Sequence, residues 1–64
     1  MDEKKLHEMM DEVTRGKGFD NKTISYKYQM EEIKKGFKSG LSMQQVQFYA
    51  DPKFDGWQME QIRL

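Results

Sequence analysis

A short stretch of the chain occurs twice. The residues QMEEIK at positions 29–34 recur 29 positions later as QMEQIR at 58–63, and an aromatic residue precedes each copy. An offset of this size is typical of helical repeats, in which each unit buries its apolar face against the next unit. We therefore expect one complete unit, residues 29–57, followed by the beginning of a second.

The spacing of apolar residues predicts helices throughout. Apolar side chains recur every three or four positions in residues 2–15, 25–39 and 42–50 and from residue 55 onward, which is the pattern of one buried helical face. Residues 23–28 alternate like an edge strand, but no second strand is available to pair with them. The sequence predicts an all-α fold: a small bundle of three to four short helices, made of about one and a fraction 29-residue repeats and an N-terminal capping helix.

The chain is long enough for only one domain. With 64 residues it buries a modest share of its surface and has a thin core. We expect a single domain over residues 1–64, with an N-terminal helix over 1–15, a glycine-containing loop over 16–24 and the repeat region over 25–64.

The expected core follows from the same spacing. Each helix contributes one apolar stripe, and Phe19 is expected to fold back from the loop onto the core. Gly36 lies inside a stripe, which indicates close approach of a neighbouring helix because glycine is otherwise unfavourable there. The residues expected to face the interior are Leu6, Met9, Met10, Val13, Tyr26, Met30, Ile33, Phe37, Met43, Val46, Tyr49, Ala50, Met59 and Ile62.

Two capping boxes are predicted. Ser42 stands three positions before Gln45, and Asp55 stands three positions before Gln58. In this arrangement each side chain accepts a hydrogen bond from the other residue's backbone N–H, which fixes where a helix begins. Leu41 precedes the first of these caps and is expected to form a hydrophobic staple across it.

Composition excludes several kinds of site. The chain has no cysteine and one histidine, so disulfides and cysteine zinc sites are ruled out. His7 alone does not make a metal site, and the aspartates lack the spacing of a calcium loop. No phosphate-binding glycine motif or catalytic constellation is present. We expect no enzymatic activity, no cofactor and no metal, and we expect Glu31 to pair with Lys35 on the helix surface.

Charge and hydropathy also limit the partners. Eleven acidic and eleven basic residues balance, whereas nucleic-acid-binding domains are usually basic. No apolar run is long enough for a membrane span, and the first residues lack the apolar segment of a signal peptide. We expect a cytoplasmic protein that binds neither membranes nor, as a main activity, nucleic acid.

Aromatic residues gather toward the C-terminal end. Phe48 and Tyr49 are neighbours in an expected helix, so only one of them can point inward. The aromatic group either packs around the turn at Pro52 or forms an exposed patch that binds a protein partner. The candidate interaction patch consists of Phe48, Phe54, Trp57 and Leu64. Weak self-association is expected at the same end, because the last unit of a helical array leaves an apolar face uncovered.

A helix-turn-helix is the alternative arrangement. The helix that begins at Ser42 would be its first helix, and the segment after Asp55 would be its reading helix. The candidate DNA-contacting residues are then Gln58, Gln61 and Arg63, since glutamine and arginine both hydrogen-bond to base edges. Nearby acidic residues and the zero net charge count against this arrangement.

The stretch from Gly40 to Arg63 carries the pattern G-L, V, Y-A-D-P-x-F and Q-M-x-x-I-R. This pattern resembles a helical repeat of small uncharacterised clostridial and other Gram-positive proteins, often associated with conjugative transposons. The resemblance covers about residues 26–64; the first copy lacks the Ala-Asp-Pro element, and the N-terminal helix lies outside it. It implies a helical repeat. Together with the residues, it leads us to expect a non-enzymatic protein-interaction module, an accessory protein of a mobile element. The alternative is a helix-turn-helix-like DNA-binding accessory protein.

Overall fold

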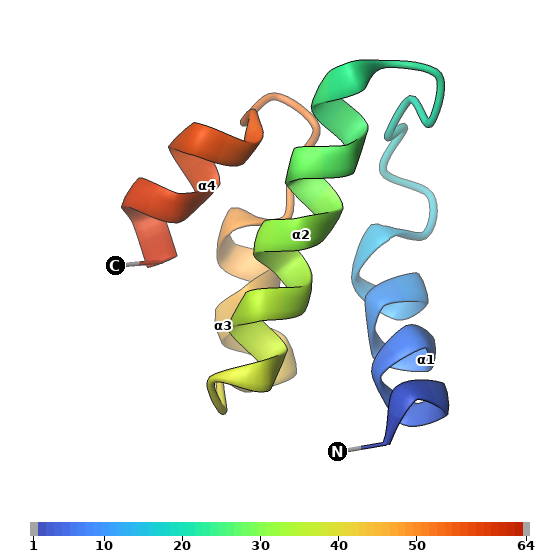
Figure 1. Ribbon diagram of the computed structural model, residues 1–64, viewed down its shortest axis with the longest axis vertical. Coiled ribbons are helices and arrows are strands. Elements are labelled where there is room, and N and C mark those ends of the chain that lie inside the picture. The colour runs from blue at the N-terminus through green and yellow to red at the C-terminus, as the bar shows by residue number, and fades with distance from the viewer. Residues whose placement is uncertain (1, 64) are drawn as a thin grey trace.

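The computed structural model describes residues 2–63 and confirms the all-α bundle. Its four helices are α1 (Glu3–Thr14), α2 (Ile24–Lys38), α3 (Met43–Tyr49) and α4 (Gly56–Arg63). The longest helix, α2, lies in the middle, with α1 on one side and α4 on the other (Figure 1). The short helix α3 packs against all three of the others. The segment 23–28, which alternates in sequence, forms the beginning of α2 and no strand.

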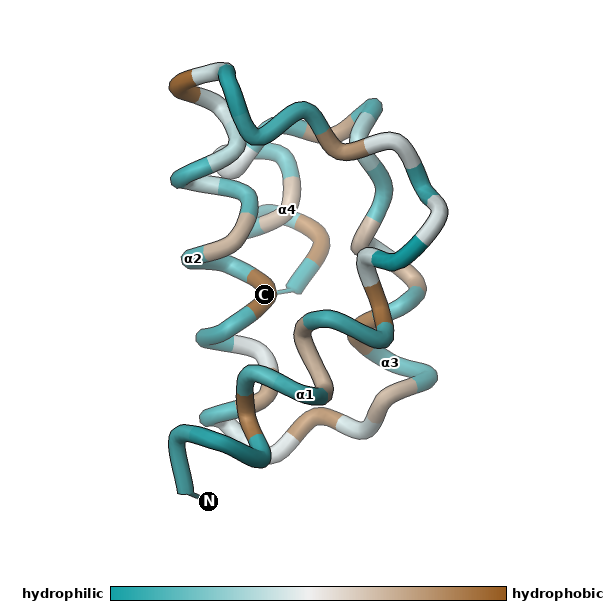
Figure 2. The backbone as a smooth tube through the Cα atoms, turned by 90° about the vertical axis from the view of Figure 1, so that its right-hand side faces the viewer, coloured by the Kyte–Doolittle hydropathy of each residue, from teal (hydrophilic) through white to brown (hydrophobic). Residues whose placement is uncertain are grey.

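The helices bury one face each. Hydrophilic and hydrophobic stretches alternate along α1 and α2, as expected of helices half exposed to solvent (Figure 2). Phe19 packs against the core from the loop before α2, as predicted. The fully buried apolar residues come from all four helices and from the residue after α3; they are Leu6, Val13, Ile33, Phe37, Val46, Tyr49, Ala50 and Met59. All eight were expected to face the interior.

One core prediction is wrong. Ile62 was expected to lie inside with its repeat counterpart Ile33, but 40% of its surface is exposed whereas Ile33 is 0% exposed. The reason is the position of each helix. The helix α2 contacts all three other helices, whereas α4 lies at the edge of the bundle, contacts only α2 and α3, and directs Met59 into the core. Ile62, three positions later, therefore lies at the rim.

Local signals set the ends of α2. It begins at Ile24, one residue before the expected start, because the hydroxyl of Thr23 accepts a hydrogen bond from the Tyr26 N–H at 3.2 Å. At the other end Gly40 adopts φ = 98°, a left-handed conformation that glycine tolerates best. The Leu41 N–H then donates to the Gly36 carbonyl at 3.1 Å, and the Gly40 N–H donates to the Phe37 carbonyl at 3.1 Å. These two bonds form a Schellman motif, which ends the helix and turns the chain toward α3.

Both predicted capping boxes are confirmed. The Ser42 hydroxyl accepts from the Gln45 N–H at 3.2 Å, and the Gln45 side chain accepts from the Ser42 N–H at 2.7 Å. Asp55 and Gln58 make the same reciprocal pair at 2.8 and 2.9 Å. Each of the helices α3 and α4 therefore begins at a pair of residues, three positions apart, that cap each other's backbone N–H groups.

Gly36 lies directly against side chains of α3, as its place in the apolar stripe predicts. The Tyr49 hydroxyl reaches over it and donates to the Glu32 carbonyl at 2.9 Å. A Cβ atom on residue 36 would overlap with that hydroxyl. Burial raises the pKa of Tyr49 to about 12, although the charge of Arg63 acts in the opposite direction. The phenol is therefore held neutral as a hydrogen-bond donor.

Candidate protein-interaction surfaces

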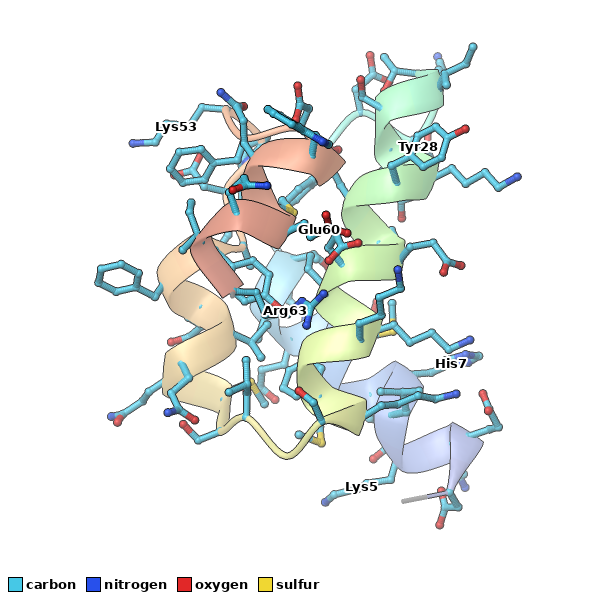
Figure 3. All side chains as sticks on the ribbon, turned by 60° about the vertical axis from the view of Figure 1, so that its left-hand side comes forward. Lys5, His7, Tyr28, Lys53, Glu60 and Arg63 are labelled. Atoms are coloured by element: carbon cyan, nitrogen blue, oxygen red, sulfur yellow. The ribbon has the colours of Figure 1, made fainter. Side chains whose placement is uncertain are left out.

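The position of α4 is set by contacts at both of its ends. Near its beginning, Gly56 lies against Tyr28 so closely that a Cβ atom there would be 2.5 Å from the Tyr28 Cβ. Near its end, Arg63 points toward α2, as does Glu60 (Figure 3). Because these contacts hold the inner side of α4 on α2, its two flanks are left as the borders of surface grooves.

A buried carboxylate anchors the end of α4. Glu32 is only 6% exposed, and its Oε1 atom accepts hydrogen bonds from the Nε and Nη2 atoms of Arg63 at 3.1 and 3.0 Å. Its Oε2 atom lies 3.3 Å from the Lys35 ammonium. Two cations thus compensate one buried charge, which a carboxylate in this environment requires. The expected pair of Lys35 with Glu31 is therefore wrong, because Lys35 pairs with Glu32.

The turn between α3 and α4 is held by a second buried polar side chain. Gln29 donates from Nε2 to the carbonyl oxygens of Phe54 at 2.7 Å and Pro52 at 3.3 Å. The Lys17 ammonium donates to the Ala50 carbonyl at 3.1 Å from the other side. Neither Gln29 nor Glu32 was expected to be buried. The signal that identifies them is their spacing, because residues 29, 32, 33 and 36 all lie on the buried face of α2.

The first groove lies between α3 and α4, and we call it the α3/α4 groove. It has a volume of about 390 Å³. The Phe48 side chain stands at its edge and is 82% exposed. The groove is lined by Leu41, Gln44, Gln45, Phe48, Tyr49, Ile62 and Arg63.

The second groove lies on the opposite flank of α4, against α2, and we call it the α2/α4 groove. Its apolar side chains are exposed, with Trp57 at 72%. Unlike the first groove it carries several charged residues. It is lined by Ile24, Ser25, Tyr28, Glu32, Lys35, Asp55, Gly56, Trp57 and Glu60.

The predicted interaction patch is divided by this geometry. Phe48 and Trp57 are both exposed, but they border different grooves on opposite flanks of α4. Phe54 is half-buried against the core, with the Lys53 ammonium 5.2 Å from its ring centre. Leu64 lies outside the described residues. The structure thus provides two aromatic surfaces in place of one, and it adds Ile24, Tyr28 and Ile62 to them.

The candidate DNA-contacting residues are mostly engaged within the chain. Gln58 belongs to the capping box with Asp55, and Arg63 is paired with Glu32. Gln61 is exposed on α4. For α4 to read base edges, Arg63 would have to leave a buried carboxylate, which costs free energy.

The segment that contains α3 is uncharged. Residues 39–50 contain no charged side chain, although 34% of the chain is charged. This run includes the whole of α3, so that even its solvent-facing residues, Gln44, Gln47 and Phe48, carry no charge. An exposed helix face without charge is unusual, because surfaces of soluble domains normally carry both signs.

The remaining candidates are the single histidine, a metal site and a membrane-spanning helix. His7 is exposed on α1, and its Nε2 atom lies 3.6 Å from the Glu3 carboxylate. Within residues 2–63, no three potential metal-ligating side chains come together. In the same part of the chain, no helix combines the length and the apolar character that crossing a membrane requires.

Compared with known proteins, the chain matches no family model, no curated protein and no solved structure.

Proposed function

We propose that this chain is a non-enzymatic protein-interaction module that binds its partner through the surfaces beside α4. The observation that supports this most is the exposure of two aromatic side chains, Phe48 and Trp57, one on each flank of the helix. Large exposed aromatic residues next to grooves are enriched where proteins bind one another. Apolar side chains exposed beside a groove mark a candidate protein-interaction site.

The repeat supports the same function. Ile62 and Gln61 lie on the α4 face that corresponds to the buried Ile33 and Glu32 of α2, yet both are exposed. At these two positions the residue is interior in the first copy of the repeat and exposed in the second, although Met59 of the second copy remains in the core. Such faces need to be covered in helical repeats, and a partner provides that cover.

The cellular role that we propose is that of a cytoplasmic accessory protein of a mobile element. Its support is the resemblance of residues 26–64 to repeats of Gram-positive proteins associated with conjugative transposons. A survey of the genes beside its own tests this role. Conjugation genes are expected there, and a neighbourhood of unrelated housekeeping genes would contradict it.

Site-specific photo-cross-linking in the native cell tests the interaction itself. A photoreactive phenylalanine analogue is placed at Phe48, at Trp57, and, as a control, at the exposed Lys4 of α1. We expect a cross-linked product of defined mass from position 48 or 57 and none from position 4. Equal background labelling at all three positions would contradict the proposal.

A further inference from the structure

We infer that the α3/α4 groove binds a second copy of this chain in a two-fold arrangement. This inference rests on the proposed function, because it names the partner for one of the two surfaces. Each copy would present the same surface to the other, as is usual in symmetric dimers.

The lack of uncompensated charge in the α3/α4 groove favours an identical surface as its partner. The α3/α4 groove contains one charged residue, Arg63, and its charge is already compensated by Glu32 at 3.0 Å. The rest of the lining belongs mainly to the uncharged run 39–50. Two identical surfaces of this kind meet without like-charge repulsion, and the chain as a whole has zero net charge.

The other groove serves as an internal comparison. Asp55 and Glu60 line the α2/α4 groove together with one cation, Lys35, which already pairs with Glu32 at 3.3 Å. A two-fold contact there would bring four carboxylates together, which is unfavourable. A second copy therefore fits the α3/α4 groove and does not fit the α2/α4 groove.

Shape and hydrogen bonding agree with a self-complementary contact. One patch carries both a projecting ring, Phe48, and a hollow of about 390 Å³ bordered by Leu41 and Ile62. In a two-fold dimer the Phe48 ring of each copy enters the hollow of the other. Gln44 also lines the hollow, and its amide has both donors and acceptors, so that it pairs with an identical group.

The size of the chain sets the strength of the contact. A standard interface buries about 800 Å² per partner, and the whole chain exposes 4602 Å². A single groove offers a smaller area than the standard interface. We therefore expect a reversible dimer that forms between micromolar and millimolar concentration.

Sedimentation equilibrium over that concentration range tests the inference with matched variants. The purified chain is compared with Phe48→Ser and with Trp57→Ser, which removes another largely exposed aromatic residue from the other flank of α4. We expect the wild type and Trp57→Ser to dimerise alike, and Phe48→Ser to dimerise at least about tenfold more weakly, equivalent to about 1.4 kcal/mol. Circular dichroism confirms that each variant is folded.

A pair of charge variants tests the two-fold geometry without removing an apolar group. Gln44→Lys and Gln44→Glu should each weaken dimerisation, because like charges then meet across the axis, and an equimolar mixture of the two should dimerise again. A wild-type chain that stays monomeric to millimolar concentration would overturn the inference, as would a dimer that is lost in Trp57→Ser and kept in Phe48→Ser. If the chain is monomeric but position 48 still cross-links to a different protein, the proposed function stands and only the second copy is ruled out.

Discussion

The guanidinium of Arg63 lies 3.0 Å from the carboxylate of Glu32, so that the end of α4 is tied to the middle of α2. Glu32 belongs to the first copy of the repeated hexapeptide and Arg63 to the second. The ion pair therefore links the two copies, and together with the buried Met59 it holds one side of α4 on the bundle.

Removing Arg63 should loosen α4 more than the rest of the fold. In Arg63→Met the buried Glu32 keeps only Lys35 as a partner, and we expect a loss of about 1–3 kcal/mol in the free energy of unfolding. Amide hydrogen exchange should accelerate first in α4. The matched control is Lys27→Met, which removes an exposed cation from α2 and should change stability by less than about 0.5 kcal/mol. Equal effects of the two substitutions would mean that the ion pair contributes nothing.

The close contact at Gly36 gives a prediction that a double variant can resolve. Gly36→Ala places a methyl group where the Tyr49 hydroxyl lies, and overpacking of this kind costs about 1–3 kcal/mol. In a Tyr49→Phe background the hydroxyl is gone, so the additional cost of Gly36→Ala should fall. Urea unfolding of the two single variants and the double variant measures this coupling. Strictly additive effects would show that the helices do not meet there.

The raised pKa of Tyr49 predicts that the free energy of unfolding decreases at high pH. Its pKa is raised from 10.0 to about 12 in the folded chain, so between these values the unfolded chain loses the proton and the folded chain keeps it. Stability from this group is therefore complete below pH 10 and falls as the pH rises toward 12, by an amount on the order of 2 kcal/mol. The difference between wild type and Tyr49→Phe isolates the contribution of this group, because the two proteins share every other ionisable side chain. A difference that stays constant over that pH range would contradict the prediction.

Duplex DNA should bind weakly. The chain has zero net charge, and Arg63 is occupied by Glu32, so few phosphate contacts are available and the salt dependence should be shallow. Titration of labelled duplex at low salt, followed by NMR, measures the affinity and the residues involved. Submicromolar, strongly salt-dependent binding with shifts at Gln58, Gln61 and Arg63 would favour the helix-turn-helix alternative.

The accuracy of the sequence predictions depends on how local each signal is. Ser42 with Gln45 and Asp55 with Gln58 lie within one turn of each other, and both caps form as predicted. The apolar stripes also identify the core, because helical periodicity shows which side of a helix is buried.

Periodicity does not show whether another element covers that side, and for this reason Ile62 was misplaced. The choice of Lys35 between Glu31 and Glu32 was equally inaccessible, because it depends on where α4 brings Arg63. Phe48 and Trp57 were recognised as exposed candidates, but their separation onto two flanks follows from the three-dimensional position of α4.

Ile33 of the first copy of the repeat lies in the core, whereas its counterpart in the second copy, Ile62, lies at an exposed edge. Ile33→Ala and Ile62→Ala make the same chemical change at equivalent positions of the two copies, and equilibrium urea unfolding at low protein concentration compares them most directly. We predict that Ile33→Ala costs about 2–5 kcal/mol, because it opens a cavity in the core, and that Ile62→Ala costs less than about 1 kcal/mol, because its side chain is already partly in water. Equal losses at the two positions would contradict the account, since they would mean that the face of α4 carrying Ile62 is buried as deeply as the core of α2.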